Sequence, residues 1–223
     1  MKLVIQLVLW AVIGLLAYML YTSVNAPVKF NEIKTARYKK VISNLKDIRS
    51  AELAYQEIVG GFIGDFDSLV RFIDTAQFAI VERRDTSYAD VEKNKAFGLD
   101  PYQGGYIKEA VILDTLGYAS VKDSIYHGTE RYKTMMNLPI EGIEGKIDLD
   151  AGMYDKSGVM YSVFEAKVSK EVVLDGLDKD LINQEKQQNS VDGVRGAFIS
   201  VGAMDDVDTG GNWSKLFDSG GKQ

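Results

Sequence analysis

Residues 3–24 read LVIQLVLWAVIGLLAYMLYTSV, an apolar stretch at the start of a chain of 223 residues. The stretch has no charged side chain, and Gln6 is its one amide. As an α-helix it would reach across the hydrocarbon core of a bilayer, which is about 30 Å thick. It therefore predicts a membrane-spanning helix at residues 1–26, with membrane lipid as its partner.

A removable secretory signal is the competing interpretation. Lys2 precedes the apolar run, and residues 24–26 loosely follow the small-x-small cleavage pattern. Two features favour retention of the helix. The run is longer than the core of a signal peptide, about 7–15 residues, and Pro27 would directly follow the cut, where its ring hinders a peptidase. We therefore expect a single-pass membrane protein.

A second, amphipathic helix follows the span. Pro27 predicts that the first helix ends or kinks there, because proline removes a helical hydrogen bond and constrains its predecessor. From residue 30 to residue 59 apolar side chains recur mainly at spacings of three and four, and Gly60-Gly61 ends the pattern. We predict a spine helix at residues 27–61. The residues expected to face the sheet of the next domain are Leu45, Ile48, Ala51, Tyr55 and Ile58.

Residues 62–223 predict a folded head. The chain is 46% hydrophobic and 26% charged, which is the composition of a domain with a core. Runs rich in β-branched and aromatic residues predict strands at 78–83, 106–113, 145–153, 159–168 and 196–201, with a hairpin loop at 154–158. Residues 117–123 fit a strand or a turn, and short helices are expected near 67–73 and 178–188. The fold class is α+β: an N-terminal transmembrane helix continues into a long amphipathic helix, packed on a head of mainly antiparallel β-strands.

The N-terminal third resembles the type IV pilins and, more closely, the pseudopilins of type II secretion. The resemblance covers about residues 1–75 and rests on the apolar span, on Pro27, and on the continuation ARYKKVISNLKDIRSAELAYQEIVGGF at residues 36–62. It implies self-assembly, with N-terminal helices bundled into a filament core and α+β heads on the surface. The family's leader, with a glycine, a phenylalanine and a glutamate five residues into the mature chain, is missing, so cleavage by a prepilin peptidase is not expected. A generic membrane-anchored protein with a β-rich domain fits the same residues.

The charges beside the span leave two topologies open. Seven Lys and Arg residues lie between Lys29 and Arg49, against only Glu32 and Asp47. By the positive-inside rule this favours a cytoplasmic head, whereas the pilin resemblance implies an extracytoplasmic one. We expect the extracytoplasmic side, with the cytoplasmic side as the alternative.

Catalytic patterns are missing from the sequence. The one histidine, His127, has no cysteine or patterned acid near it, and we expect an exposed loop residue. Neither a Gly-x-Ser-x-Gly elbow nor a phosphate-binding glycine loop occurs. The net charge of −6 argues against a nucleic-acid partner. We therefore expect no enzymatic activity and no cofactor.

A C-terminal acidic loop is the one candidate ligand site. Residues 205–212 read DDVDTGGN, which places carboxylates two residues apart before a glycine turn, as in loops that bind calcium. The pattern departs from an EF-hand, because Gly210 stands at its fifth position and Phe217 replaces the bidentate glutamate. An exposed polar turn is the alternative. The candidate calcium ligands are Asp205, Asp206, Asp208 and Asn212.

Two further features predict structure and not chemistry. Asp175, Asp178 and Asp180 are expected in turns and helix caps. Trp213, near Phe217, is expected to dock the C-terminal tail on the head. The sequence leaves three hypotheses: a pilin-like subunit of an envelope assembly, a cytoplasm-facing membrane adaptor, and a tethered calcium- or solute-binding module.

Overall fold

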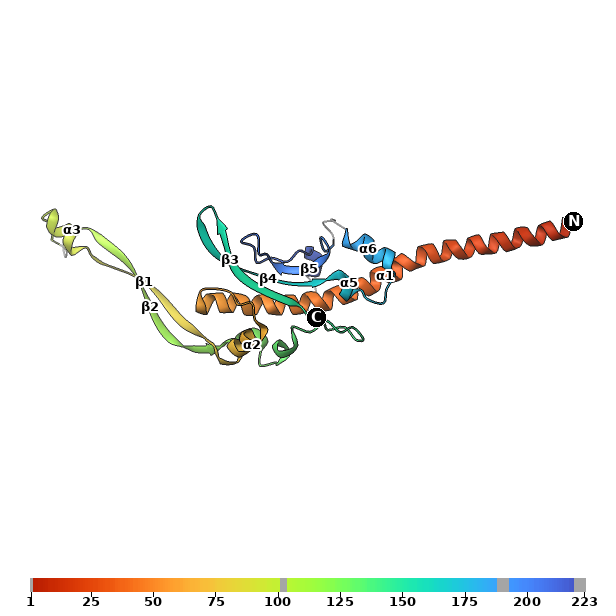
Figure 1. Ribbon diagram of the computed structural model, residues 1–223. Helices are drawn as coiled ribbons and strands as arrows, with labels where there is room; N and C mark the ends of the chain where they lie inside the picture. The colour runs from red at the N-terminus through yellow and green to blue at the C-terminus, as the bar shows by residue number, and fades with distance from the viewer. Residues whose placement is uncertain (1, 101–103, 188–192, 219–223) are drawn as a thin grey trace. The chain divides into compact units, whose positions relative to one another are not determined.

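The chain begins with one long helix, α1 (Lys2–Val59). The computed structural model describes residues 2–100, 104–187 and 193–218, without the side chains of Thr22 and Leu216. Figure 1 shows α1 as an unbroken ribbon, and Pro27 lies inside it. The helix therefore does not end at Pro27, since the fixed φ of proline fits a helix and its ring removes one hydrogen bond of a long series. The long helix and the antiparallel sheets confirm the predicted α+β class.

The end of α1 follows the glycine signal in the sequence. Gly60 has a φ of +92°, a left-handed conformation that favours glycine, and its N–H donates to Gln56 O over 2.9 Å. Helix α2 (Phe66–Thr75) comes next, and the N–H of Ser68 donates to the Asp65 carboxylate over 2.8 Å. The capping residue is therefore Asp65, since it precedes the first helical turn.

The chain divides into two compact units, residues 1–71 with 130–223, and residues 72–129. The predicted domain boundaries after residues 26 and 61 stay predictions.

The first unit holds a three-stranded antiparallel sheet of β3 (Asp148–Lys156), β4 (Val159–Ser169) and β5 (Phe198–Gly202), in the order β3-β4-β5. The β3–β4 hairpin turns at Ser157-Gly158, both with positive φ, so the loop is shorter than predicted. β3 begins later than predicted, because Gly145 and Ile147 bond with the backbone of residues 136–138.

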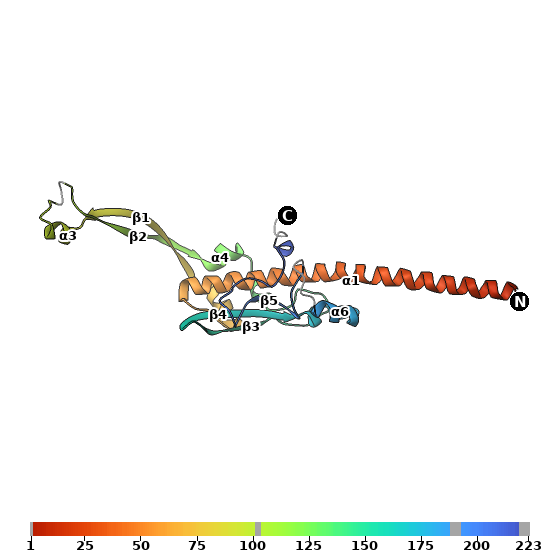
Figure 2. The same ribbon diagram turned by 90° about the horizontal axis from the view of Figure 1, so that it is seen from above.

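One face of this sheet lies against α1. Figures 1 and 2 show β4 and β5 beside the second half of the helix, and both strands contact it. The predicted stripe is mostly right: Leu45, Ile48 and Ala51 are fully buried and Tyr55 is half-buried. Ile58 is 40% exposed, because it lies in the last turn of the helix, beside the Gly60 end. The sheet residues of the core are Leu149, Phe164, Ala166, Val168, Ile199 and Val201.

Short helices complete the first unit. They are η1 (Arg131–Thr134), α5 (Lys170–Val173), α6 (Lys179–Lys186) and η2 (Lys215–Phe217). Asp178 caps α6, accepting hydrogen bonds from the N–H groups of Asp180 and Leu181, as predicted for this acidic group. The predicted helix extended to residue 188, which lies outside the described residues.

The second unit is a long β-ribbon. β1 (Gln77–Ala89) pairs antiparallel with β2 (Ile107–Ser120), with a bulge after Ile80, and α3 (Val91–Ala96) follows β1. Helix α4 (Val121–Tyr126) begins directly after β2 and is capped by Ser120. Residues 117–123, left open between strand and turn, are thus the end of β2 and the start of α4. The predicted strands at 78–83 and 106–113 are each about half of the strand that forms.

Candidate functional site

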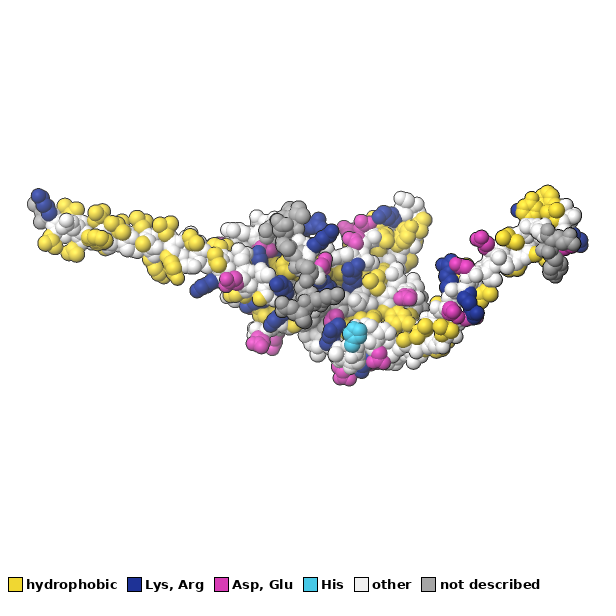
Figure 3. Space-filling model, turned by 180° about the vertical axis from the view of Figure 1, so that it is seen from behind, with side chains coloured by type: hydrophobic (Ala, Val, Ile, Leu, Met, Phe, Trp, Pro, Cys, Tyr) yellow, Lys and Arg dark blue, Asp and Glu magenta, His cyan; other side chains and the backbone are white. Residues whose placement is uncertain are grey.

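The apolar half of α1 is bare. Every described side chain from residue 3 to residue 24 is exposed, including Trp10 at 72% and Leu3 at 70%. Figure 3 shows this half as a rod covered with hydrophobic side chains. Within the described chain, α1 is the one helix that is long and apolar enough to cross a membrane. This half is therefore a candidate membrane span or a signal sequence.

A small-residue position lies in the middle of this half. A side chain built on Gly14 would meet no atom of the chain within 4 Å, and Ala17, one turn later, is exposed. Small residues on one side of a helix allow two helix backbones to approach closely in a membrane. Substitution at Gly14 would therefore change what packs on the helix without disturbing the chain's own fold.

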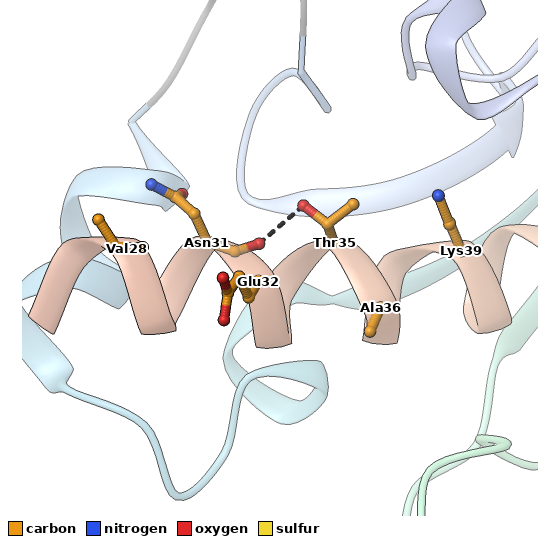
Figure 4. Close-up of a pocket in the computed structure, with 6 residues that line it drawn as sticks. All are labelled: Val28, Asn31, Glu32, Thr35, Ala36 and Lys39. Atoms are coloured by element: carbon orange, nitrogen blue, oxygen red, sulfur yellow. Dashed lines mark hydrogen bonds between the residues drawn. The ribbon is translucent and has the colours of Figure 1, made fainter. Parts of the chain in front are cut away.

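The border between the bare and the buried half lies at Phe30, the first buried side chain of α1. Beside it a shallow groove follows one stripe of the helix, shown in Figure 4, in which Thr35 donates to Asn31 O over 2.7 Å. The lining residues are Val28, Asn31, Glu32, Thr35, Ala36 and Lys39. That hydrogen bond is internal to the helix, whereas the side chains of Asn31, Glu32 and Lys39 are exposed along the groove.

Several of the seven basic residues between Lys29 and Arg49, here called the basic collar, bind the head. Lys34 bonds with the Glu185 carboxylate over 2.9 Å, Arg37 donates to the carbonyl oxygens of Val173 and Asp175, and Lys46 contacts the C-terminal segment. The sequence count of seven positive charges therefore overstates the charge free to meet lipid. Lys29, Lys39 and Lys40 are exposed and remain available to anionic headgroups.

A buried ion cluster joins α1 to α5 and α6. The Nζ of Lys170 is fully buried and donates to Glu185 O and Val194 O, each over 2.8 Å, and contacts the Glu185 carboxylate over 3.2 Å. Tyr38 donates to the same carboxylate over 3.4 Å. Burial lowers the pKa of Lys170, an effect that the Glu185 charge opposes, and burial raises the pKa of Tyr38. The two lysines of the cluster, Lys34 and Lys170, thus share one carboxylate.

Sequence reasoning missed this cluster. Lys34 and Glu185 are 151 residues apart, so no spacing rule connects them. The weak signal was a lysine, Lys170, directly after a buried strand and before the apolar residues Val172, Val173 and Leu174.

A second buried carboxylate lies near the end of α1. Glu52 is fully buried; its Oε2 accepts the N–H of Ile63 over 3.1 Å, and its Oε1 has no partner among the described residues. Burial raises the pKa of Glu52 to about 7, although the bond from Ile63 acts in the opposite direction. The carboxyl group therefore holds the turn after α1 and changes charge near neutral pH.

The C-terminal tail docks as predicted. Trp213 is only 9% exposed, and its indole N–H donates to Asp218 over 3.0 Å. The ring of Phe217 lies 6.4 Å from that of Tyr38 on α1, and Lys46 donates to Phe217 O over 2.8 Å. Packing is thus the role of Trp213.

Three of the four predicted calcium residues are engaged in other bonds, and the fourth, Asp205, is exposed. Asp206 pairs with Lys156 over 2.7 Å, and Asp208 accepts the N–H of Gly210. The amide of Asn212 donates to Arg195 O and Phe198 O and accepts the N–H of Ser200, which holds residues 210–213 along β5. No group of three acidic or histidine side chains that could hold a metal forms within the described residues. Calcium binding stays a prediction.

The histidine has a local structural position. His127 is exposed and forms the C-cap of α4 with a φ of 51°, so the expectation of an exposed loop histidine is confirmed.

Comparison of the chain with protein-family models, with curated proteins and with solved structures finds no match. The interpretation of the site therefore depends on the chain's own geometry.

Proposed function

We propose that the protein is a single-pass, membrane-anchored structural subunit of an envelope assembly, arranged like a pilin or pseudopilin. One observation carries the proposal: a single 58-residue helix is bare and apolar in its first half and buried by a folded head in its second. Such a helix, about 87 Å long, ties the position of the head to lateral packing within the membrane. In this proposal the protein acts by associating with other proteins and does not catalyse a reaction.

The attachment of the head supports this role. Lys34, Arg37 and Lys46 each bond α1 to a different part of the head, and Lys170 of α5 bonds to the same Glu185 that Lys34 contacts. A head fixed at several points moves with its helix. A flexible tether would leave the head free to move independently.

The proposal is tested by thiol cross-linking in the membrane. The chain has no cysteine, so Ala17→Cys introduces the only thiol. Val12→Cys is the matched control, because at 100° per residue it lies on the opposite side of the helix from Gly14 and Ala17. We expect oxidation to yield a dimer for Ala17→Cys and little for Val12→Cys, and Gly14→Leu to suppress the Ala17→Cys dimer. Equal yields at both positions would show random collision and contradict a specific helix contact.

A cytoplasm-facing adaptor is the second candidate, favoured by the exposed Lys29, Lys39 and Lys40 at the border of the apolar half. The two proposals differ in topology. A C-terminal tag should be cleaved by protease added to intact spheroplasts if the head is extracytoplasmic. Protection of the tag, with cleavage only after lysis, would replace the pilin-like proposal with the adaptor.

A further inference from the structure

The β1–β2 ribbon is a sheet without a covering layer. None of its residues is buried, and side chains on both strands are largely exposed, including Leu113 at 62%, Leu116 at 66% and Ile107 at 67%. Within the described residues, β1 pairs only with β2, so the outer edge of each strand has no strand beside it. The outward-facing backbone groups of these two edges therefore lack a ladder partner in the part of the chain that the structure describes.

Such a ribbon needs further contacts to be stable. Isolated two-stranded hairpins are marginal in water, and three or more strands or a covering helix are normally required. Stacking one ribbon face on another would bury roughly 430 Å² per copy, from about 43 Å of strand length and about 10 Å of width, which is below the roughly 800 Å² per partner of a stable interface. Edge pairing instead adds a ladder of backbone hydrogen bonds, which is the main source of affinity when a strand is added to a sheet edge.

The ribbon itself identifies a strand that fits its edges. β1 accepts β2 antiparallel over its whole length, and Arg84 bonds with both Glu82 on its own strand and Asp114 on the other. This pairing shows that the side chains of β2 are compatible with β1 in charge and size. From Val81 to Ala89 the ladder has neither a bulge nor a proline, two of the devices that block an edge. Charge, a third device, is present at residues 82–85 of β1, but in both signs, so a neighbouring β2 can pair with it as Asp114 pairs with Arg84.

We propose that the ribbon joins a second copy of this chain edge to edge, with β1 antiparallel to β2 of its neighbour. A copy displaced sideways without rotation presents its β2 to the open edge of β1 in the antiparallel sense, because the two strands alternate in direction within each ribbon. The contact is head-to-tail, so each added copy again exposes one β1 edge and one β2 edge. It extends a row of subunits and is separate from any contact made by α1.

The test uses two single-cysteine forms of the full chain, purified in detergent with different tags. Ser87 and Glu109 face one another across the ladder, and both are exposed. A mixture of Ser87→Cys and Glu109→Cys chains, treated with a short bismaleimide, should yield a dimer that carries both tags. Ser87→Cys alone and Glu141→Cys, an exposed position outside the ribbon, should stay monomeric. A Ser87→Cys homodimer would mean that two β1 edges meet, and either that result or no dimer at all would overturn the proposal.

A second variant separates edge pairing from loss of the hairpin. Val111→Lys with Leu113→Lys adds charge to β2 at two exposed positions. The intrachain cross-link of a Ser87→Cys, Glu109→Cys chain reports that the hairpin survives. We expect the mixed dimer to fall about tenfold, which corresponds to about 1.4 kcal/mol, and Val91→Lys, on exposed α3, to leave it unchanged. An unchanged yield with the double lysine variant would contradict pairing through β2.

Discussion

The two sheets of this protein contrast in how their surfaces are used. The sheet β3-β4-β5 has one face covered by α1, and residues 210–213 lie along β5. The ribbon β1–β2 has no buried residue and two open edges. Similar β-rich sequences thus form a covered sheet that holds its own unit together and a bare one whose apolar residues are free for association. The difference teaches that strand propensity alone does not tell a core from an interface.

The largest expected effect breaks the covered sheet. Phe164 is 1% exposed, and its ring lies 4.7 Å from that of Phe62. Phe164→Ala should lower the free energy of unfolding of the first unit by about 3–5 kcal/mol, through lost burial and a cavity. Denaturant titration followed by Trp213 fluorescence, in a Trp10→Phe background, measures this. A loss below that of an exposed position would mean that the sheet is not the core.

The ion cluster should give the next effect. Glu185→Gln leaves the buried Lys170 and the half-buried Lys34 beside a neutral amide, and we expect a loss of about 3 kcal/mol. The same titration measures it. Glu171→Gln is the matched control, since Glu171 pairs with Lys186 on the exposed surface and should change stability by less than about 1 kcal/mol. Equal effects of the two variants would show that burial does not strengthen the cluster.

Glu52 makes the covered unit sensitive to pH. Its pKa is raised from 4.5 to about 7 by burial, so the folded state holds a proton that the unfolded state has already lost. The free energy of unfolding should therefore fall between about pH 4.5 and pH 7, by roughly 3 kcal/mol, and stay level above.

The control for this pH dependence is Glu52→Gln, which cannot ionise. It should remove that fall and be more stable than the parent at pH 8. Parallel stability curves for parent and variant would contradict the assignment to Glu52.

Asn212 tests the covered edge of β5. Asn212→Ala removes three side-chain hydrogen bonds, and we expect a loss of about 1–2 kcal/mol in the thermal or denaturant unfolding of the first unit. The loss should be the same with and without calcium, because the amide is used within the chain. A parent melting temperature that calcium raises, and an Asn212→Ala chain that calcium does not stabilise, would instead support the predicted calcium loop.

The smallest effect is expected in the ribbon. Leu113→Ala removes a large side chain that is 62% exposed, so stability of the monomer should change by less than about 0.5 kcal/mol. Association should weaken instead, measured by the mixed-tag cross-linking of Ser87→Cys and Glu109→Cys. A large loss of monomer stability would show that the ribbon is covered within the single chain.

Much of the fold was predictable because its signals are local. The apolar run, the spacing of Leu45, Ile48 and Ala51, and the glycine after residue 59 together predicted α1 and its buried stripe. Strand positions were predicted better than strand lengths, since the ribbon continues through residues of mixed polarity that carry no clear alternation. The helix does not end at Pro27, one of the two predicted outcomes, because a single lost hydrogen bond is outweighed by the many others of a long helix.

Some features of the candidate site were predictable from the sequence, and others were not. The sequence predicted the bare helix, the docking of Trp213 and the helix cap at Asp178. It could not predict the ion pair between Lys34 and Glu185, because this contact depends on how α6 packs against α1. The sequence therefore suggested more positive charges available to lipid headgroups in the basic collar than the structure leaves exposed.

By itself, the sequence determined that a long apolar helix begins the chain, that an amphipathic helix continues it, and that antiparallel strands follow. Periodicity and turn residues act over a few positions, and they suffice for these elements. Only the tertiary structure decided which sheet is covered, which lysines are buried, and that Glu52 titrates near pH 7. Burial is a property of contacts between distant residues, and burial sets the free energy of a charge or an apolar face.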